Sequence, residues 1–155
     1  MITQKMKYGL KALMVLAAER ASEGRALRIE EIATRSGTPK RFLEHILLEI
    51  RNAGFIASVR GRHGGYALIK EPREVPLSEL MRLIDGPIAP LPCLSRRAYQ
   101  KCEDCPDEES CRLRQVFGQV FWSYLLLIES LTLADLVDRP ESPGGTAAAA
   151  LQLGV

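Results

Sequence analysis

The sequence predicts a mainly α protein, a winged helix-turn-helix with a two-stranded wing, followed by a long C-terminal helix. Two observations support this prediction. Apolar residues recur every three or four positions in the first 53 residues and again beyond residue 113, which is typical of amphipathic helices. Between these regions, two short apolar segments flank the glycine-rich turn RGRHGG at residues 60–65, which predicts a β-hairpin.

The first helix is expected to begin at Thr3, a residue suited to cap it, and to end near Ala21, where SEGRA interrupts the pattern. Its buried stripe consists of Met6, Leu10, Leu13, Met14 and Ala17. A short helix over residues 29–36 follows and ends at the SGTP turn.

The third helix is expected over residues 39–53, because Pro39 suits a helix start and Gly54 suits a position just beyond a helix end. Its buried stripe should consist of Phe42, Leu43, Ile46, Leu47 and Ile50. The short helix, the turn containing Gly37 and this helix together form a helix-turn-helix unit. The hairpin after it, with strands at residues 55–59 and 66–70, is the wing.

The second half begins with a short helix over residues 75–85, with Pro76 or Ser78 near its start. Residues 86–93 hold three prolines and read as an irregular connector, and a cysteine-rich loop follows. A long helix begins near Cys111, and Thr132 is placed to cap a last short turn, LADLV. The resulting divisions are a winged helix-turn-helix domain (1–85), a connector with the cysteine loop (86–112), the long helix (113–138) and a tail expected to be mobile (139–155).

The two halves of the chain carry opposite charge. Residues 1–70 hold 13 Lys and Arg against 6 Asp and Glu, whereas residues 71–155 hold 8 against 13. A basic half is typical of a partner for a polyanion, and it coincides here with the helix-turn-helix pattern.

We expect the chain to be cytoplasmic. Lys5, Lys7 and Lys11 precede the apolar run of residues 12–18, as in a secretory signal, but that run is very short and belongs to the helical stripe. No apolar run is long enough for a membrane span. Cytoplasmic thiols stay reduced, which favours metal binding or redox sensing over structural disulfides for clustered cysteines.

Candidate contacts to double-stranded DNA lie on the third helix and the wing. Residues at the N-terminal end of a recognition helix enter the major groove, where arginine binds guanine and glutamate accepts from cytosine. Arginines at a wing tip suit phosphate contacts or a narrow minor groove. The alternative is an ordinary solvated surface. The candidates are Lys40, Arg41, Glu44 and His45 on the helix, and Arg60, Arg62 and His63 on the wing.

The long helix has an apolar seam that either packs on its own domain or pairs with a second copy of the chain. We expect a homodimer, because a twofold protein reads a palindromic operator. The residues predicted for dimerisation are Val116, Phe117, Val120, Phe121, Tyr124, Leu127, Ile128 and Leu131, with Leu113 at the start of the seam.

The four cysteines, Cys93, Cys102, Cys105 and Cys111, have the spacing C-x8-C-x2-C-x5-C. The C-x2-C pair allows two thiolates to share one ion or cluster, and four thiolates suit zinc and an iron–sulfur cluster equally well. Five nearby carboxylates should raise the cysteine pKa values, which disfavours a free reactive thiolate. The alternative is a set of unligated thiols or a disulfide. No catalytic constellation is recognisable in the sequence, so we do not expect an enzyme.

The chain resembles the family of bacterial winged-helix regulators that includes the iron–sulfur cluster regulator IscR and the nitric oxide sensor NsrR. Four features carry the resemblance: KYGLKALMVLA (7–17), the helix-turn-helix, SVRGRHGGYAL (58–68), and the cysteine loop before a long helix that ends in SLTLADLV (130–137). The resemblance implies a dimer whose DNA affinity or site preference changes with cluster gain or loss. It implies DNA contacts for Arg41, Glu44 and Arg60, and cluster ligands at Cys93, Cys105 and Cys111.

This chain departs from the family pattern at the fourth ligand. The first gap between cysteines is longer and holds the additional Cys102. Arg114 stands where the IscR type has a histidine, and Lys7 stands where the NsrR type has an aspartate. We therefore predict an all-cysteine iron–sulfur cluster, either 2Fe–2S or 4Fe–4S.

The predicted function is a homodimeric transcriptional regulator, repressor or activator, that senses iron–sulfur status, redox state or nitric oxide. One alternative is a cluster-free regulator of the same fold that uses thiol oxidation or zinc. Another is an interaction protein that uses the acidic, cysteine-rich half and does not bind DNA.

Overall fold

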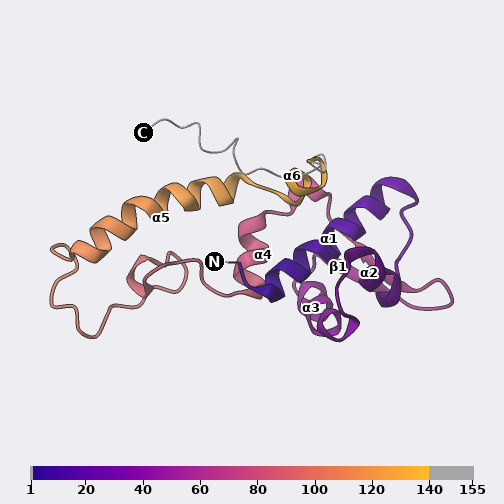
Figure 1. Cartoon of the computed structure of the whole chain (residues 1–155), viewed down its shortest axis with the longest axis horizontal. Coiled ribbons are helices and arrows are strands. Elements are labelled where there is room, and N and C mark those ends of the chain that lie inside the picture. The colour runs from indigo at the N-terminus through magenta and orange to yellow at the C-terminus, as the bar shows by residue number, and fades with distance from the viewer. Residues whose placement is uncertain (1, 140–155) are drawn as a thin grey trace.

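The computed structural model describes residues 2–139, and Figure 1 shows the order and arrangement of its elements. The predicted mainly α fold with a two-stranded wing and a long C-terminal helix is confirmed. The tail predicted to be mobile lies outside the described residues, except for Arg139. The elements are α1 (Gln4–Ser22), α2 (Ile29–Ser36), α3 (Lys40–Asn52), β1 (Ile56–Val59), β2 (Gly65–Leu68), the 3-10 turn η1 (Pro72–Glu74), α4 (Leu77–Ile84), the 3-10 turn η2 (Pro92–Leu94), α5 (Arg112–Ser130) and α6 (Leu133–Val137).

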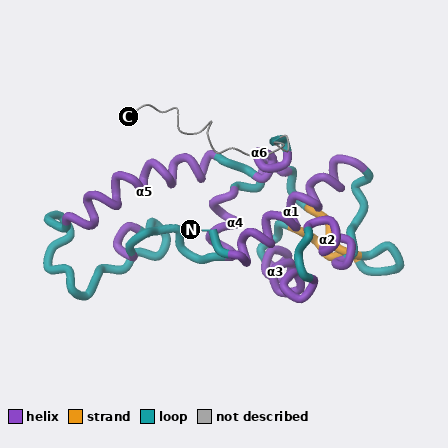
Figure 2. Tube along the Cα trace, in the orientation of Figure 1, coloured by secondary structure: helices purple, strands orange, loops and turns teal. Residues whose placement is uncertain are grey.

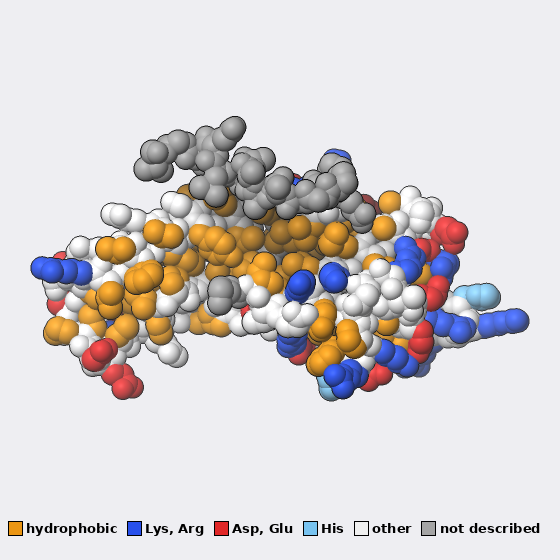
Figure 3. Space-filling view, viewed as in Figure 1, with side chains coloured by type: hydrophobic (Ala, Val, Ile, Leu, Met, Phe, Trp, Pro, Cys, Tyr) orange, Lys and Arg blue, Asp and Glu red, His pale blue; other side chains and the backbone are white. Residues whose placement is uncertain are grey.

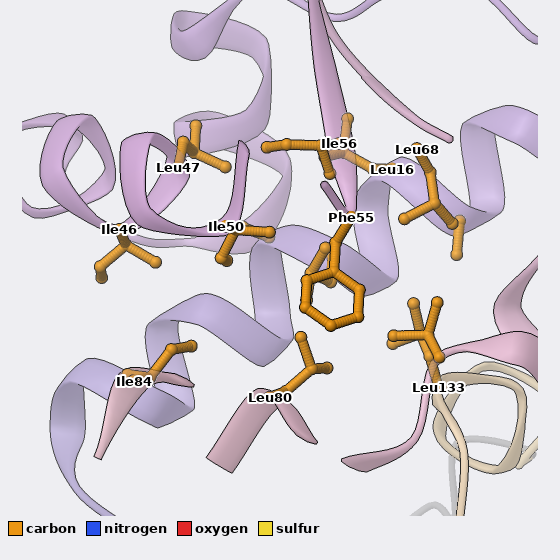
Figure 4. Close-up of a cluster of buried hydrophobic side chains, with 14 of the residues drawn as sticks. Leu16, Ile46, Leu47, Ile50, Phe55, Ile56, Leu68, Leu80, Ile84 and Leu133 are labelled. Atoms are coloured by element: carbon orange, nitrogen blue, oxygen red, sulfur yellow. The ribbon is translucent and has the colours of Figure 1, made fainter. Parts of the chain in front are cut away.

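One hydrophobic core joins α1, α3, α4, the hairpin and α6 (Figure 4). Phe55 lies near its centre, between Ile50 of α3 and Leu80 of α4, and Leu133 of α6 closes one side. Helix α1 packs closely against α3 and α4 at Gly9, where only a glycine leaves room. A methyl group there would lie 2.8 Å from Ile84 Cδ1 and 3.3 Å from Ile46 Cγ2.

Helix α3 differs from the prediction in two details. It begins at Lys40, because Pro39 has an extended backbone and precedes the helix as its cap residue. Phe42 does not join the buried stripe and is 43% exposed. Its ring packs at the surface instead, 5.6 Å from the Tyr8 ring and 4.8 Å from the Arg41 guanidinium. The other four stripe residues are buried.

The wing is anchored to the segment before α2. Strands β1 and β2 pair antiparallel, with Ile56 opposite Leu68 and Val59 opposite Gly65. Leu27 adds a bridge to Tyr66, with N–H to O distances of 2.9 Å and 2.8 Å in the two directions. A side chain on Gly65 would collide with the Leu27 backbone carbonyl, which explains the need for glycine at that position.

Helix α5 extends away from the domain, with the connector and the cysteine loop alongside it (Figures 1 and 2). Its C-terminal end is attached through a backbone bridge between Pro76 and Thr132. Thr132 is the N-cap of α6, as predicted. Its N–H and hydroxyl donate to the Asp135 carboxylate at 2.7 Å and 2.8 Å. The connector is less irregular than predicted, because η2 forms a single 3-10 turn within it. Within residues 2–139, no helix is long and apolar enough to cross a membrane.

Candidate nucleic-acid interface and metal centre

The predicted recognition residues form one exposed face of α3. Its opposite side is buried in the core, so Lys40, Arg41, Glu44 and His45 all point outward. Lys40 Nζ lies 2.6 Å from Glu30 Oε1 of α2, which raises the pKa of Lys40 and lowers that of Glu30 through their hydrogen bond. Contact of Lys40 with a DNA phosphate would therefore compete with this ion pair.

The predicted wing residues Arg60, Arg62 and His63 are exposed at the hairpin tip. Lys, Arg and His side chains gather at this end of the molecule, which also holds α2 and α3 (Figure 3). Gly61 has φ 108°, which L side chains rarely adopt, so the tight tip depends on glycine. Helix α3 and the wing thus present basic side chains from the same end of the domain.

Sequence reasoning missed Arg28, which precedes α2. Its guanidinium Nη2 donates to the backbone carbonyl of Arg62 at 2.7 Å and so contacts the wing tip directly. The position carried no signal in the sequence, because arginine is not a typical helix cap and the contact spans 34 residues.

The cysteine loop begins at Cys93, which lies in η2 and is 5% exposed. Cys93 packs with Leu94, Phe121 and Leu125, and Cys102 packs against this cluster. Partial burial and a hydrogen bond with Cys93 raise the pKa of the Cys102 thiol. The pKa of Cys102 is therefore raised, as predicted. Burial and the neighbouring thiol contribute more to this rise than the carboxylates do.

The other two cysteines form a second pair. Burial and the neighbouring Cys111 raise the pKa of the Cys105 thiol. The two pairs are linked by a turn in which the Cys105 N–H donates to the Cys102 carbonyl at 3.3 Å. Asp107 then shapes the backbone before α5, because its carboxylate accepts the N–H groups of residues 109 and 110 at 3.2 Å and 3.0 Å.

The donor set fits a thiophilic metal centre, but the thiols are arranged two by two. Within the described part of the chain, no three His, Cys, Asp or Glu side chains converge as they would around one bound ion. Four thiols within one loop region, already neighbours in pairs, are nevertheless the ligands that zinc and iron–sulfur clusters require. Binding would require the two pairs to close on each other and the thiols to lose their protons.

Arg114, which stands where the IscR type has a histidine, holds the cysteine loop against α5. Its guanidinium donates to the Cys93 backbone carbonyl. It also lies 3.5 Å from the Glu108 carboxylate, which in turn accepts a hydrogen bond from the Tyr99 hydroxyl. The hydrogen bond to Glu108 raises the pKa of Tyr99. These three side chains therefore connect the start of the loop, its end and the first turn of α5.

The seam predicted for α5 divides into two faces. Phe121 is 4% exposed and packs on the connector of its own chain, while Ile128 and Leu131 pack partly on the core. The apolar stripe of α5 is wide, so one edge packs on its own chain while the other edge remains exposed. The outer apolar face, exposed to solvent, consists of Leu113, Val116, Phe117, Val120, Tyr124 and Leu127.

An apolar groove of about 520 Å³ adjoins the outer apolar face, between α5, α4 and the connector. The hydroxyl of Thr3 donates to Asp85 at its polar edge. The groove is lined mainly by Met81, Pro87, Ile88, Phe117, Val120, Phe121 and Tyr124.

Comparison with known proteins gives one consistent result. Residues 2–139 match the family described as Rrf2, an iron-dependent transcriptional regulator. A Rhodobacter capsulatus protein described as an rrf2-like HTH-type transcriptional regulator is 70% identical over 138 residues, covering 88% of this chain and 92% of that protein. Protein rrf2 of Nitratidesulfovibrio vulgaris is 28% identical over 136 residues, covering 88% of this chain and 86% of its own.

The solved structures agree with this. CymR (YrzC), the global cysteine regulator of B. subtilis, has a TM-score of 0.73 at 28% identity, covering 91% of this chain and 98% of its own. IscR of T. potens has a TM-score of 0.69 at 26% identity, covering 97% and 96%. The expectation that the protein is not an enzyme is confirmed by the family match and the 70% identical relative. With that match over residues 2–139, the chain belongs to the Rrf2 family of DNA-binding transcriptional regulators.

Proposed function

We propose that this regulator is a homodimer whose DNA affinity changes when Cys93, Cys102, Cys105 and Cys111 bind an iron–sulfur cluster. The observation that carries the proposal is the place of the four cysteines. They lie in one loop region at the base of α5, with their thiols adjacent in pairs. A change in this loop is thus adjacent to the helix proposed to join two chains.

The proposed dimer rests on the outer apolar face of α5. Its six large apolar side chains are all exposed, and an exposed apolar patch rimmed by polar residues marks an interaction surface. The adjoining groove extends this surface toward α4. A second copy would place two recognition helices for the half-sites of a palindromic operator.

All-cysteine ligation is supported by Arg114, the residue that stands where the IscR type has its histidine ligand. Arg114 is engaged with the Cys93 carbonyl and Glu108, and a guanidinium is not a metal ligand. Cys102 lies against Cys93 and supplies the remaining thiolate. When bound, the cluster would supply sensitivity to iron supply, oxidation or nitric oxide.

The route from the loop to the DNA-binding face runs through α4. Arg97, four residues after Cys93, lies 2.7 Å from Glu79 of α4. Arg82 of the same helix lies 2.6 Å from Glu129 of α5. Because α4 also packs on α1 and α3, an altered loop and a bound DNA can bias one shared equilibrium.

A second candidate is a thiol switch without a cluster. The sequence leaves a disulfide open without fixing its partners, and the packing of Cys102 against Cys93 favours Cys93–Cys102 over Cys102–Cys105. Mass spectrometry after mild oxidation with peroxide would identify that disulfide. A zinc site with the same ligands is the other cluster-free form.

The test is anaerobic purification of the full chain, with a visible spectrum and iron, sulfide and zinc analysis. The proposal predicts a coloured protein with two or four irons per chain and matching sulfide. A colourless protein with one zinc per chain would refute the cluster and leave DNA binding intact. A salt titration of DNA binding addresses the interaction-protein alternative, since phosphate contacts give affinities that fall steeply with salt.

A further inference from the structure

The wing tip, residues 60–64, has few connections to the rest of the domain. Its side chains at 60, 62 and 63 are exposed, and its internal bond is from the Gly64 N–H to the Gly61 carbonyl at 2.9 Å. Among the hydrogen bonds of residues 2–139, Arg28 Nη2 to the Arg62 carbonyl, 2.7 Å, is the one that joins this tip to another element. The Leu27–Tyr66 bridge anchors β2. Beyond that bridge, the orientation of the glycine-rich tip is set largely by its contact with Arg28.

Arg28 is itself held by the helix-turn-helix unit. Its backbone N–H donates to Glu31 Oε2 of α2 at 3.1 Å, and its neighbour Leu27 is bridged to β2. Arg28 therefore connects the tip to α2. Because α2 packs on α3, it also connects the tip to the proposed recognition helix.

We infer that Arg28 is a positioning residue for DNA recognition: its hydrogen bond to the Arg62 carbonyl fixes the orientation of the wing tip, which places Arg60 and Arg62 relative to α3. Without it, the tip samples more orientations, and wing contacts to DNA must order it at the cost of affinity. This role rests on the proposed contact of the wing with DNA. It differs from a phosphate contact by Arg28 itself, which would act independently of Arg60.

The experiment is a double-mutant cycle on the full chain, using operator DNA selected by the wild-type protein. Arg28→Ala should weaken binding about fivefold or more, as should Arg60→Ala, while the double variant should be no more than about twofold weaker than Arg60→Ala. Arg28→Lys, which keeps one donor for the carbonyl, should recover part of the loss. The matched control is Arg73→Ala, since Arg73 is exposed in η1 and none of the hydrogen bonds or ion pairs of residues 2–139 joins it to Arg28 or to the tip.

Each result has a distinct meaning. Wild-type affinity for Arg28→Ala beside a loss for Arg60→Ala overturns the positioning role alone. Full affinity for both variants overturns it together with the wing's proposed contact. Independent losses that multiply, with a salt slope reduced by about one for Arg28→Ala, make Arg28 a phosphate contact and also overturn the positioning role. The thermal midpoint of Arg28→Ala should remain within about 2 °C of the wild type, because the residue is exposed.

Discussion

At the scale of single residues, each cysteine has a different environment. Cys93 is buried in the small cluster under α5, Cys102 lies on it, and the other two are paired nearer the surface. The Arg114 guanidinium holds the Cys93 backbone by donating a hydrogen bond to its carbonyl. The side chain most in question is Cys102, because it is the departure from the family pattern that makes four thiolates available.

Replacing Cys102 tests the proposed ligand set. Cys102→Ser keeps the size of the side chain but removes a thiolate, so we expect it to lose most of its iron and sulfide and its visible absorption. Iron and sulfide per chain should be measured beside wild type after identical anaerobic reconstitution. Full retention of the cluster would mean that the fourth ligand comes from elsewhere.

Adjacent leucines on α3 test the core at this scale. Leu47 is 0% exposed and Leu48 is 41% exposed. Leu47→Ala should lower the free energy of unfolding by about 2–5 kcal/mol, because it leaves a cavity in a packed core. Leu48→Ala, the matched control, should change it by about 0.5 kcal/mol or less.

Denaturant unfolding at one protein concentration provides this comparison, since the stability of a dimer depends on concentration. Equal losses for the two variants would contradict the placement of α3.

At the scale of elements, α5 is the helix with two roles. Its inner face, with Phe121 and Leu125, holds the connector, while its outer apolar face is exposed. The three-four spacing predicts an apolar helix but not which edge of a wide stripe meets its own chain. That distinction depends on where η2 and the connector lie, and no local pattern encodes their position.

Dimerisation is tested by placing a charge on the outer apolar face. Val120 is 69% exposed, so Val120→Glu should leave the fold intact while burying an unpaired carboxylate in any dimer. We expect a monomer at micromolar concentration by light scattering. Gln119→Glu, the same new charge one position along the helix, should remain dimeric, and a dimer for Val120→Glu would refute the assigned interface.

At the scale of the whole molecule, the basic helix-turn-helix and wing lie at one end and the cysteine loop lies at the other (Figures 1 and 3). The basic side chains gather around α2, α3 and the wing, and the cysteine loop lies at the far end beside α5 (Figures 1 and 3). Helix α4 lies between them. Its Glu79 pairs with Arg97 after the connector, and its Arg82 pairs with Glu129 of α5. This arrangement supports long-range control of DNA binding, carried by rigid helices and charged contacts.

Much of this organisation follows from the sequence, because each helix has a strong apolar period and the wing has a clear turn. Phe42 was misassigned because it fits the period of α3 but sits at the helix start, where Tyr8 and Arg41 supply a surface contact. Arg28 and the Arg114–Glu108–Tyr99 group could not be predicted, since their partners are distant in sequence or bind through backbone atoms.

The most direct test of the central claim is the operator affinity of the wild-type chain with and without its cluster, at one salt concentration. Coupling between two sites typically changes affinity about 5- to 150-fold. We predict a difference of at least about fivefold between loaded and cluster-free protein, and no such difference for Cys102→Ser taken through the same treatment. Equal affinities for the loaded and cluster-free wild-type dimer would contradict the proposed regulation.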